Sequence, residues 1–91
     1  MEIYWTHKAQ DDLERIYNFA LQYSRQHADD VLDRLITGST GLTVHPAIGV
    51  QQTRYEPREV RKVLFGDYEI HYEVKDNDIF IVDLWHTKEE C

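Results

Sequence analysis

The sequence predicts an α+β domain in which a helical hairpin packs on one face of an antiparallel sheet. Two observations predict this class. Apolar residues recur at helical spacing through the first half of the chain, and strand-like runs separated by turn residues fill the second half. The simplest packing of these elements places both helices on one face of the sheet and leaves the other face open. The expected order is an N-terminal strand, two helices and a three-stranded meander.

The first half of the chain begins with a short strand and continues as two helices. Residues 2–5 alternate and are rich in strand formers, and Thr6 suits the N-cap of a helix expected over residues 7–26. A second helix is expected to follow a few connecting residues around His27 and to continue to about Leu42. Because the connection is short, the two helices are predicted to form an antiparallel hairpin.

Three large apolar residues near the end of the first predicted helix do not belong to its main stripe. They widen its apolar face, which predicts that this end of the helix makes contacts on two sides. These residues are Phe19, Leu21 and Tyr23.

The second half of the chain carries the signals of a loop followed by strands. Residues 44–57 contain prolines, a glycine and a Gln-Gln pair, which are typical of a loop. Glycine and polar residues then mark two tight turns between apolar runs. We expect three antiparallel strands at residues 59–65, 68–74 and 79–85.

The predicted middle strand has two chemically different faces. Its residues alternate strictly, so Tyr68 and Tyr72 are expected to point toward the helices. The last strand is mostly apolar, which is typical of a strand buried on both faces. The side chains expected on the open face of the middle strand are Glu69, His71 and Glu73.

Composition narrows the class of protein. The 91 residues are 42% hydrophobic and 30% charged, which is typical of one compact domain spanning residues 1–91, and no apolar run approaches the ~18 residues of a membrane span. The single cysteine, Cys91, leaves no internal disulfide and no cysteine-based zinc site, so a cytoplasmic location is expected. The five histidines are scattered without metal-ligand spacing, and neither a metal nor a cofactor is predicted.

Charge is unevenly distributed along the chain. Seventeen acidic against ten basic residues give a net charge of -7, which argues against nonspecific nucleic-acid binding because that affinity comes mainly from neutralising phosphates. Basic side chains gather in residues 54–62 and acidic ones in residues 66–91. The basic group is expected either to contact an acidic surface of a target or simply to pair with Glu56 and Glu59 in solvent.

Three sequence motifs, taken in order, resemble those of the RelE/ParE superfamily of bacterial toxins. They are W-x3-A-x2-DL-x2-I at residues 5–16, EVRKVLFGDYEIHYEV at residues 59–74 and IFIVDLWH at residues 79–86. The resemblance extends over nearly the whole chain and is closer to the ParE branch. It implies the toxin of a type II toxin–antitoxin system that inhibits DNA gyrase and blocks replication, with no turnover of its own.

The resemblance also implies partners. A small ParD-like antitoxin, with a ribbon-helix-helix N-terminus, is expected to fold an amphipathic segment across this chain and form a hetero-oligomer with it. DNA is then contacted only through gyrase or through the antitoxin. The candidate target-contacting residues are three from the basic stretch, Arg58, Arg61 and Lys62, and two near the C-terminus, His86 and Lys88, where the family commonly has a histidine followed by basic residues. The candidate antitoxin contacts are Trp5, Tyr17 and Trp85. For the two tryptophans, core packing is the first expectation and antitoxin contact the second.

Three acidic residues depart from the family pattern and bear on the activity. Glu69 and Glu73 stand where related toxins carry arginines, and Glu89 interrupts the basic residues that commonly follow the histidine near the C-terminus. Cleavage of messenger RNA, the activity of RelE-like toxins, needs a base, an acid and cations that stabilise the phosphorane. A RelE-like ribosome-dependent endonuclease is the alternative function, because RelE-like toxins belong to the same superfamily. A non-toxic antitoxin-binding module is a further alternative, because acidic residues stand where the family carries cations.

Overall fold

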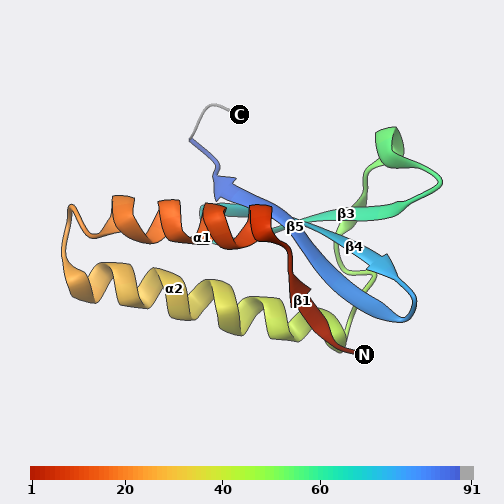
Figure 1. The fold of residues 1–91 in the computed structure, drawn as a ribbon, viewed down its shortest axis with the longest axis horizontal. Helices are drawn as coiled ribbons and strands as arrows, with labels where there is room; N and C mark the ends of the chain where they lie inside the picture. Colours follow the sequence, from red (N-terminus) through yellow and green to blue (C-terminus); the bar gives the residue numbers. More distant parts are fainter. Residues whose placement is uncertain (89–91) are drawn as a thin grey trace.

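The computed structural model describes residues 1–88 as two α-helices packed against a five-stranded sheet (Figure 1). Glu89, one of the three acidic departures named above, lies outside the described residues. No helix in the described part of the chain is long and apolar enough to cross a membrane. The elements are β1 (Ile3–Trp5), α1 (His7–Ala20), α2 (Arg25–Thr40), the 3-10 helix η1 (Gly41–Thr43), β2 (Val50–Gln51), the 3-10 helix η2 (Thr53–Tyr55), β3 (Glu59–Phe65), β4 (Tyr68–Lys75) and β5 (Asp78–His86).

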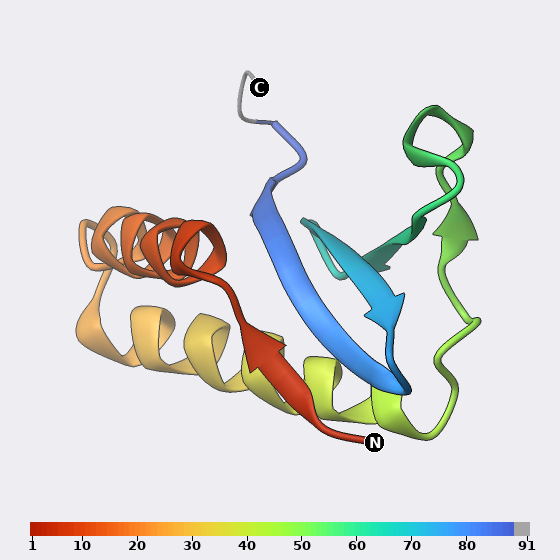
Figure 2. The same cartoon turned by 45° about the vertical axis from the view of Figure 1, so that its right-hand side comes forward.

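The sheet has the order β1-β5-β4-β3-β2, and both helices cover the same face of it (Figure 2). Strands β3, β4 and β5 form the predicted antiparallel meander. The whole sheet is mixed because β1 runs parallel to β5, with Ile3 opposite Ile79 and Trp5 opposite Ile81. The predicted α+β class, with an N-terminal strand, a helical hairpin and a meander, is confirmed, and β1 and β2 extend the meander at its two edges.

The helical hairpin turns earlier in the chain than predicted. Helix α1 ends at Ala20, and the turn occupies residues 21–24 instead of lying around His27. The reason is a second N-cap: the Ser24 side chain accepts a hydrogen bond from the backbone N–H of His27 at 3.0 Å, which starts α2 at Arg25. The predicted N-cap of α1 is confirmed, because the Thr6 hydroxyl accepts from the N–H of Ala9 at 3.2 Å.

The hydrophobic core lies between the helices and one face of the sheet. Helix α2 comes close to β3 at Gly38, where an added Cβ would meet the ring of Phe65 at 3.1 Å. The buried residues of the core are Ala9, Ile16, Ala20, Ala28, Val31, Leu35, Leu42, Ile70, Tyr72, Ile79, Ile81 and Leu84.

The segment predicted as a loop is tied to the sheet by Tyr72. The Tyr72 hydroxyl donates to the carbonyl of Pro46 at 2.8 Å and accepts from the N–H of Gly49 at 2.9 Å. Gly49 has no room for a side chain, because a Cβ would lie 2.8 Å from the Tyr72 hydroxyl. This anchoring lets the segment form the short edge strand β2, in which Val50 lies opposite Lys62. No strand was expected there, because a two-residue strand has too few positions to show a period.

Strand β5 is buried on one face, so the prediction that it is buried on both faces is wrong. Its fully buried residues face the helices, whereas Asp83 and Trp85 on the other face are only partly buried. A register shift opposite His71 and Tyr72 inserts one extra residue into β5 and keeps Ile81 and Leu84 on the same face.

Candidate functional site

The open face of the sheet carries a charged surface built from β3, β4 and η2. Arg58, a predicted target-contacting residue, donates two hydrogen bonds to the carboxylate of Glu73, at 3.1 Å from Nε and 3.0 Å from Nη2. This bidentate pairing lowers the pKa of Glu73, because Arg58 favours its charged form. Arg58 is therefore an exposed cation whose charge is already balanced.

Arg54 joins Arg58 and Glu73 on this surface, and both arginines lie near the ring of Tyr55. The guanidinium carbons of Arg54 and Arg58 lie 4.9 Å and 5.9 Å from the ring centroid of Tyr55 on η2. Arg54 was not among the predicted contact residues. The only sequence signal for it was its membership of the basic stretch, because its position over Tyr55 depends on the turn made by η2.

The two remaining basic candidates of β3 lie on opposite faces. Arg61 points to the helix side, where it pairs with Glu59 at 2.8 Å and donates to the carbonyl of Gly49 at 2.8 Å. It thereby supports β2, together with Tyr72. Lys62 lies on the open face, directly opposite His71 in the ladder between β3 and β4.

His71 lies on the open face, as predicted, but its side chain is only 5% exposed. Its ring packs against the ring of Trp85, with 4.7 Å between centroids. The ring nitrogens face two carboxylates: Nε2 lies 2.9 Å from Glu69 and Nδ1 lies 3.5 Å from Asp83. Asp83 was not singled out in the sequence, although a carboxylate inside an apolar run is a signal that could have been used.

Asp83 belongs to a crowded electrostatic environment. Burial raises the pKa of its carboxyl group, while the positive charges of His71, Lys8 and Arg54 act in the opposite direction. Its Oδ1 atom is buried and has no hydrogen-bond partner among the described residues. Within residues 1–88, no group of three His, Cys, Asp or Glu side chains is arranged to hold a metal ion.

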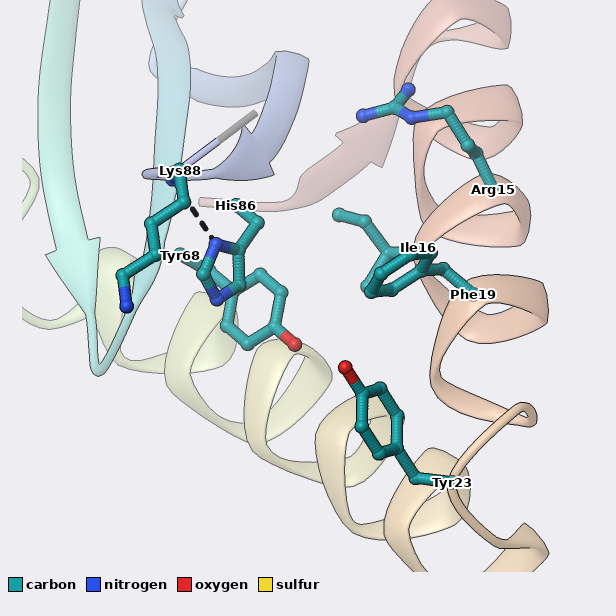
Figure 3. A pocket seen from close by; sticks show the side chains of 7 residues that line it. All are labelled: Arg15, Ile16, Phe19, Tyr23, Tyr68, His86 and Lys88. Carbon is teal, nitrogen blue, oxygen red and sulfur yellow. Dashed lines mark hydrogen bonds between the residues drawn. The ribbon is translucent and has the colours of Figure 1, made fainter. Parts of the chain in front are cut away.

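The other two predicted target-contacting residues, His86 and Lys88, line a pocket on the helix side of the sheet (Figure 3). The pocket has a volume of about 460 Å³ and lies between α1 and the neighbouring ends of β4 and β5. Nδ1 of His86 accepts a hydrogen bond from the backbone N–H of Lys88 at 3.1 Å. The hydroxyls of Tyr68 and Tyr23 point toward each other across the pocket.

Exposed aromatic residues form the outer rim of this pocket. Phe19 is 59% exposed and Tyr23 is 71% exposed, and their rings contact each other edge to face at 6.1 Å between centroids. The three extra apolar residues near the end of the first predicted helix thus lie mainly on the surface, and two of them, Phe19 and Tyr23, line the pocket. Single exposed apolar residues are ordinary, but adjacent ones beside a pocket are typical of a binding surface.

The five predicted target-contacting residues therefore do not form one cluster. Arg58 and Lys62 lie on the open face, Arg61 faces the helices, and His86 and Lys88 lie at the pocket. Glu73, the partner of Arg58, and Tyr68, the register partner of His86, are five residues apart on β4, which is about 17 Å.

The predicted antitoxin contacts are also divided between the two faces. Trp5 and Tyr17 pack against the core, and the Tyr17 hydroxyl donates to Asp29 at 2.7 Å and so links the two helices. Trp85 lies on the open face against His71. All three remain predictions as contacts, and the packing roles of Trp5 and Tyr17 are evident from their surroundings.

Comparison with solved structures places this architecture in a known class. The chain is similar to a structure described as the chromosomal ParDE TA system from P. aeruginosa, with a TM-score of 0.78 and 21% sequence identity. The match covers 94% of this chain and 95% of that chain, so the two chains share one fold over nearly their full lengths. No curated protein sequence matches the chain.

The sequence assigns the chain to one family. The family model for the ParE toxin of type II toxin–antitoxin systems, parDE, matches residues 3–91. The chain therefore belongs to the ParE toxin family, which confirms the resemblance drawn from its three motifs.

Proposed function

We propose that this chain inhibits DNA gyrase, blocks replication, and is neutralised by a ParD-like antitoxin. Membership of the ParE toxin family over residues 3–91 is the observation that carries the proposal. The antitoxin contributes a ribbon-helix-helix N-terminus and an amphipathic segment that folds on the toxin, giving a hetero-oligomer. A gyrase target also places the chain in the cytoplasm, with DNA contacted only through gyrase or the antitoxin.

The charges of the open face favour a protein target over RNA. Three carboxylates, those of Glu69, Glu73 and Asp83, lie on this face. Of the cations of residues 54–62 on the same face, Arg58 is committed to Glu73, which leaves Arg54 and Lys62. A phosphate about 4 Å from a carboxylate is repelled by ~1 kcal/mol in water and by more where water is excluded. Affinity for a protein surface depends instead on a few well-packed contacts and on local complementarity, so a net charge of -7 does not oppose it.

A pair of assays with purified protein separates gyrase inhibition from RNA cleavage. The protein is added to a gyrase supercoiling reaction and, separately, to a translation extract programmed with messenger RNA. We expect loss of supercoiling with accumulation of cleaved DNA, and intact messenger. Cut messenger with unaffected supercoiling would replace the gyrase proposal by the endonuclease, and no effect in either assay would favour a non-toxic antitoxin-binding module.

Lysine variants test which surface meets the target. Lys88 lines the pocket and Lys62 lies on the open face, whereas Lys75 is exposed at the end of β4 and serves as the matched control. We expect Lys88→Ala to weaken gyrase inhibition severalfold and Lys75→Ala to leave it unchanged. Weakening by Lys62→Ala alone would move the target surface to the open face, and full potency of all three variants would contradict both assignments.

The pocket also suits the antitoxin, because a neutralising partner must mask the surface that the target uses. Its apolar walls and the exposed rings of Phe19 and Tyr23 fit the apolar face of an amphipathic helix. Further candidate antitoxin contacts are Trp85, Trp5 and Tyr17. Their half-buried side chains offer less free surface than the pocket rim.

Affinity measurements with the antitoxin encoded beside this gene test that assignment. We expect Phe19→Ala and Tyr23→Ala each to weaken binding about tenfold, the loss typical of an aromatic anchor residue. Ile36→Ala is the matched control, because Ile36 is 43% exposed on α2 and does not line the pocket. Equal losses in all three variants would show that the pocket has no special part in binding.

A further inference from the structure

The hydrogen bonding around His71 depends on how many protons its imidazole and the two neighbouring carboxylates hold. Glu69 lies 2.9 Å from Nε2 and Asp83 lies 3.5 Å from Nδ1, so each ring nitrogen faces a carboxylate oxygen. A neutral imidazole has one N–H and can satisfy only one of these oxygens. With both carboxylates ionised, the other oxygen would face a nitrogen lone pair of a ring that is only 5% exposed.

One additional proton removes this conflict. If it resides on the ring, the imidazolium donates toward both carboxylates. If it resides on Asp83, the acid O–H donates to the lone pair of Nδ1. In either form the three groups carry one negative charge instead of two. In either form the proton supplies a hydrogen bond between Nδ1 of His71 and the buried Oδ1 atom of Asp83, which has no hydrogen-bond partner within residues 1–88.

We propose that Glu69, His71 and Asp83 form a proton-binding site on the open face, which holds one proton more than a neutral imidazole with two ionised carboxylates. The ligand of this site is a proton taken up from solvent as the chain folds. The burial of Asp83, which raises the pKa of its carboxyl group, acts in the same direction. The inference does not depend on the gyrase proposal, because the number of bound protons is a property of this chain alone. It makes the open face less negative by one charge than three ionised carboxylates would.

Charged groups on the neighbouring elements modulate the site without replacing the proton. Lys8 and Asp12 approach from α1, where they are paired with each other at 2.6 Å, and they act in opposite directions on the pKa of Asp83. Arg54 on η2 is exposed and lies over Tyr55, and Lys62 is the β3 neighbour of His71. None of these cations hydrogen-bonds to Asp83 Oδ1.

The proposal predicts how stability responds to pH. In the unfolded chain near neutral pH the imidazole is largely neutral and both carboxylates are ionised. The folded chain then binds more protons than the unfolded chain, so its stability falls as pH rises through the loss of the extra proton. Because the folded chain holds one extra proton, the unfolding equilibrium constant rises up to tenfold for each unit by which the pH increases in this range. The weakening is expected between β4 and β5, where the register shift lies next to His71.

Nitrogen-15 spectra of the imidazole rings and carbon-13 spectra of the carboxyl groups test the site in the whole protein. Near pH 7 we expect either both nitrogens of His71 protonated or one nitrogen protonated together with one neutral carboxyl group, that of Asp83 or of Glu69. One N–H with both carboxyl groups ionised would overturn the proposal. Because these spectra are recorded on the unmodified protein, the result does not depend on whether a variant folds.

An Asp83→Asn variant provides a readout that a merely structural role would not change. The amide of asparagine can donate to Nδ1, so His71 in this variant no longer needs the extra proton. We expect its spectrum to show a single N–H near neutral pH and the additional pH slope of the unfolding constant to disappear. His45→Gln, which removes an exposed histidine, is the control and should keep the slope. An unchanged slope in Asp83→Asn would contradict the proposal.

Discussion

The carboxylate of Asp12 on α1 accepts a hydrogen bond from the backbone N–H of Leu84 on β5, with 3.1 Å between nitrogen and Oδ2. Asp12 also pairs with Lys8 and Arg15 on its own helix, at 2.6 Å each, and its side chain is only 4% exposed. The Leu84 N–H lies beyond the part of β5 that pairs with β1. A side chain from the helix therefore completes the hydrogen bonding of the strand edge and holds the hairpin on the sheet.

Removal of this carboxylate should destabilise the fold. In Asp12→Ala the Leu84 N–H loses its partner in a buried position, and we expect a loss of about 2–3 kcal/mol in the free energy of unfolding. Urea denaturation measures the change. Asp11→Ala is the matched control, because Asp11 is exposed on the same helix, and it should cost less than about 0.5 kcal/mol. Similar losses in the two variants would contradict the role given to Asp12.

Lowering the pH should remove the stabilisation that the Asp12 carboxylate provides. Burial acts to raise the pKa of Asp12, but the hydrogen bonds from Lys8, Leu84 and Arg15 outweigh it and hold its pKa below the ordinary value. The stabilisation is therefore present above the carboxyl pKa of the unfolded chain and is lost as pH falls through the lower pKa of the folded chain. The difference in unfolding free energy between the unmodified protein and Asp12→Ala should shrink as pH falls below about 4. A difference that stays constant into acid would show that charge is not involved.

The hydroxyl of Tyr72 should contribute to stability through the segment that it anchors. In Tyr72→Phe the buried N–H of Gly49 loses its acceptor, and a loss of about 1–3 kcal/mol is expected on chemical denaturation. Tyr4→Phe is the control, because the Tyr4 ring stacks on Phe80 and is 48% exposed. Faster amide hydrogen exchange at Val50 in Tyr72→Phe would locate the damage at β2, and unchanged exchange there would argue against the anchor.

Two glycines near the end of α2 should respond differently to alanine. Replacing glycine by alanine in a helix normally stabilises it by up to about 1 kcal/mol. Nothing lies within 4 Å of a Cβ added at Gly41, so Gly41→Ala should show this gain in thermal unfolding. At Gly38 the added Cβ would press on the Phe65 ring, so Gly38→Ala should give a smaller gain or a loss. A larger gain at Gly38 would show that the ring moves aside freely.

Elements whose signal is local could be predicted from the sequence. The cap at Thr6 and the strands of the meander follow from side-chain type and from spacing over a few residues. The end of α1 could not be placed in the same way, because the helical pattern continues past Ala20. There the Ser24 cap decides where the chain turns.

The sequence by itself therefore determined the α+β class and the family, because both depend on periodic patterns and motifs that can be read along the chain. Only the tertiary structure decided which charged residues meet. It placed Arg61 on the helix side and Lys62 on the open face, and it brought Asp83 to His71 across the ladder between β4 and β5. Such neighbours depend on register and on a one-residue shift in β5, which arise from packing between distant segments and leave no periodic trace along the chain.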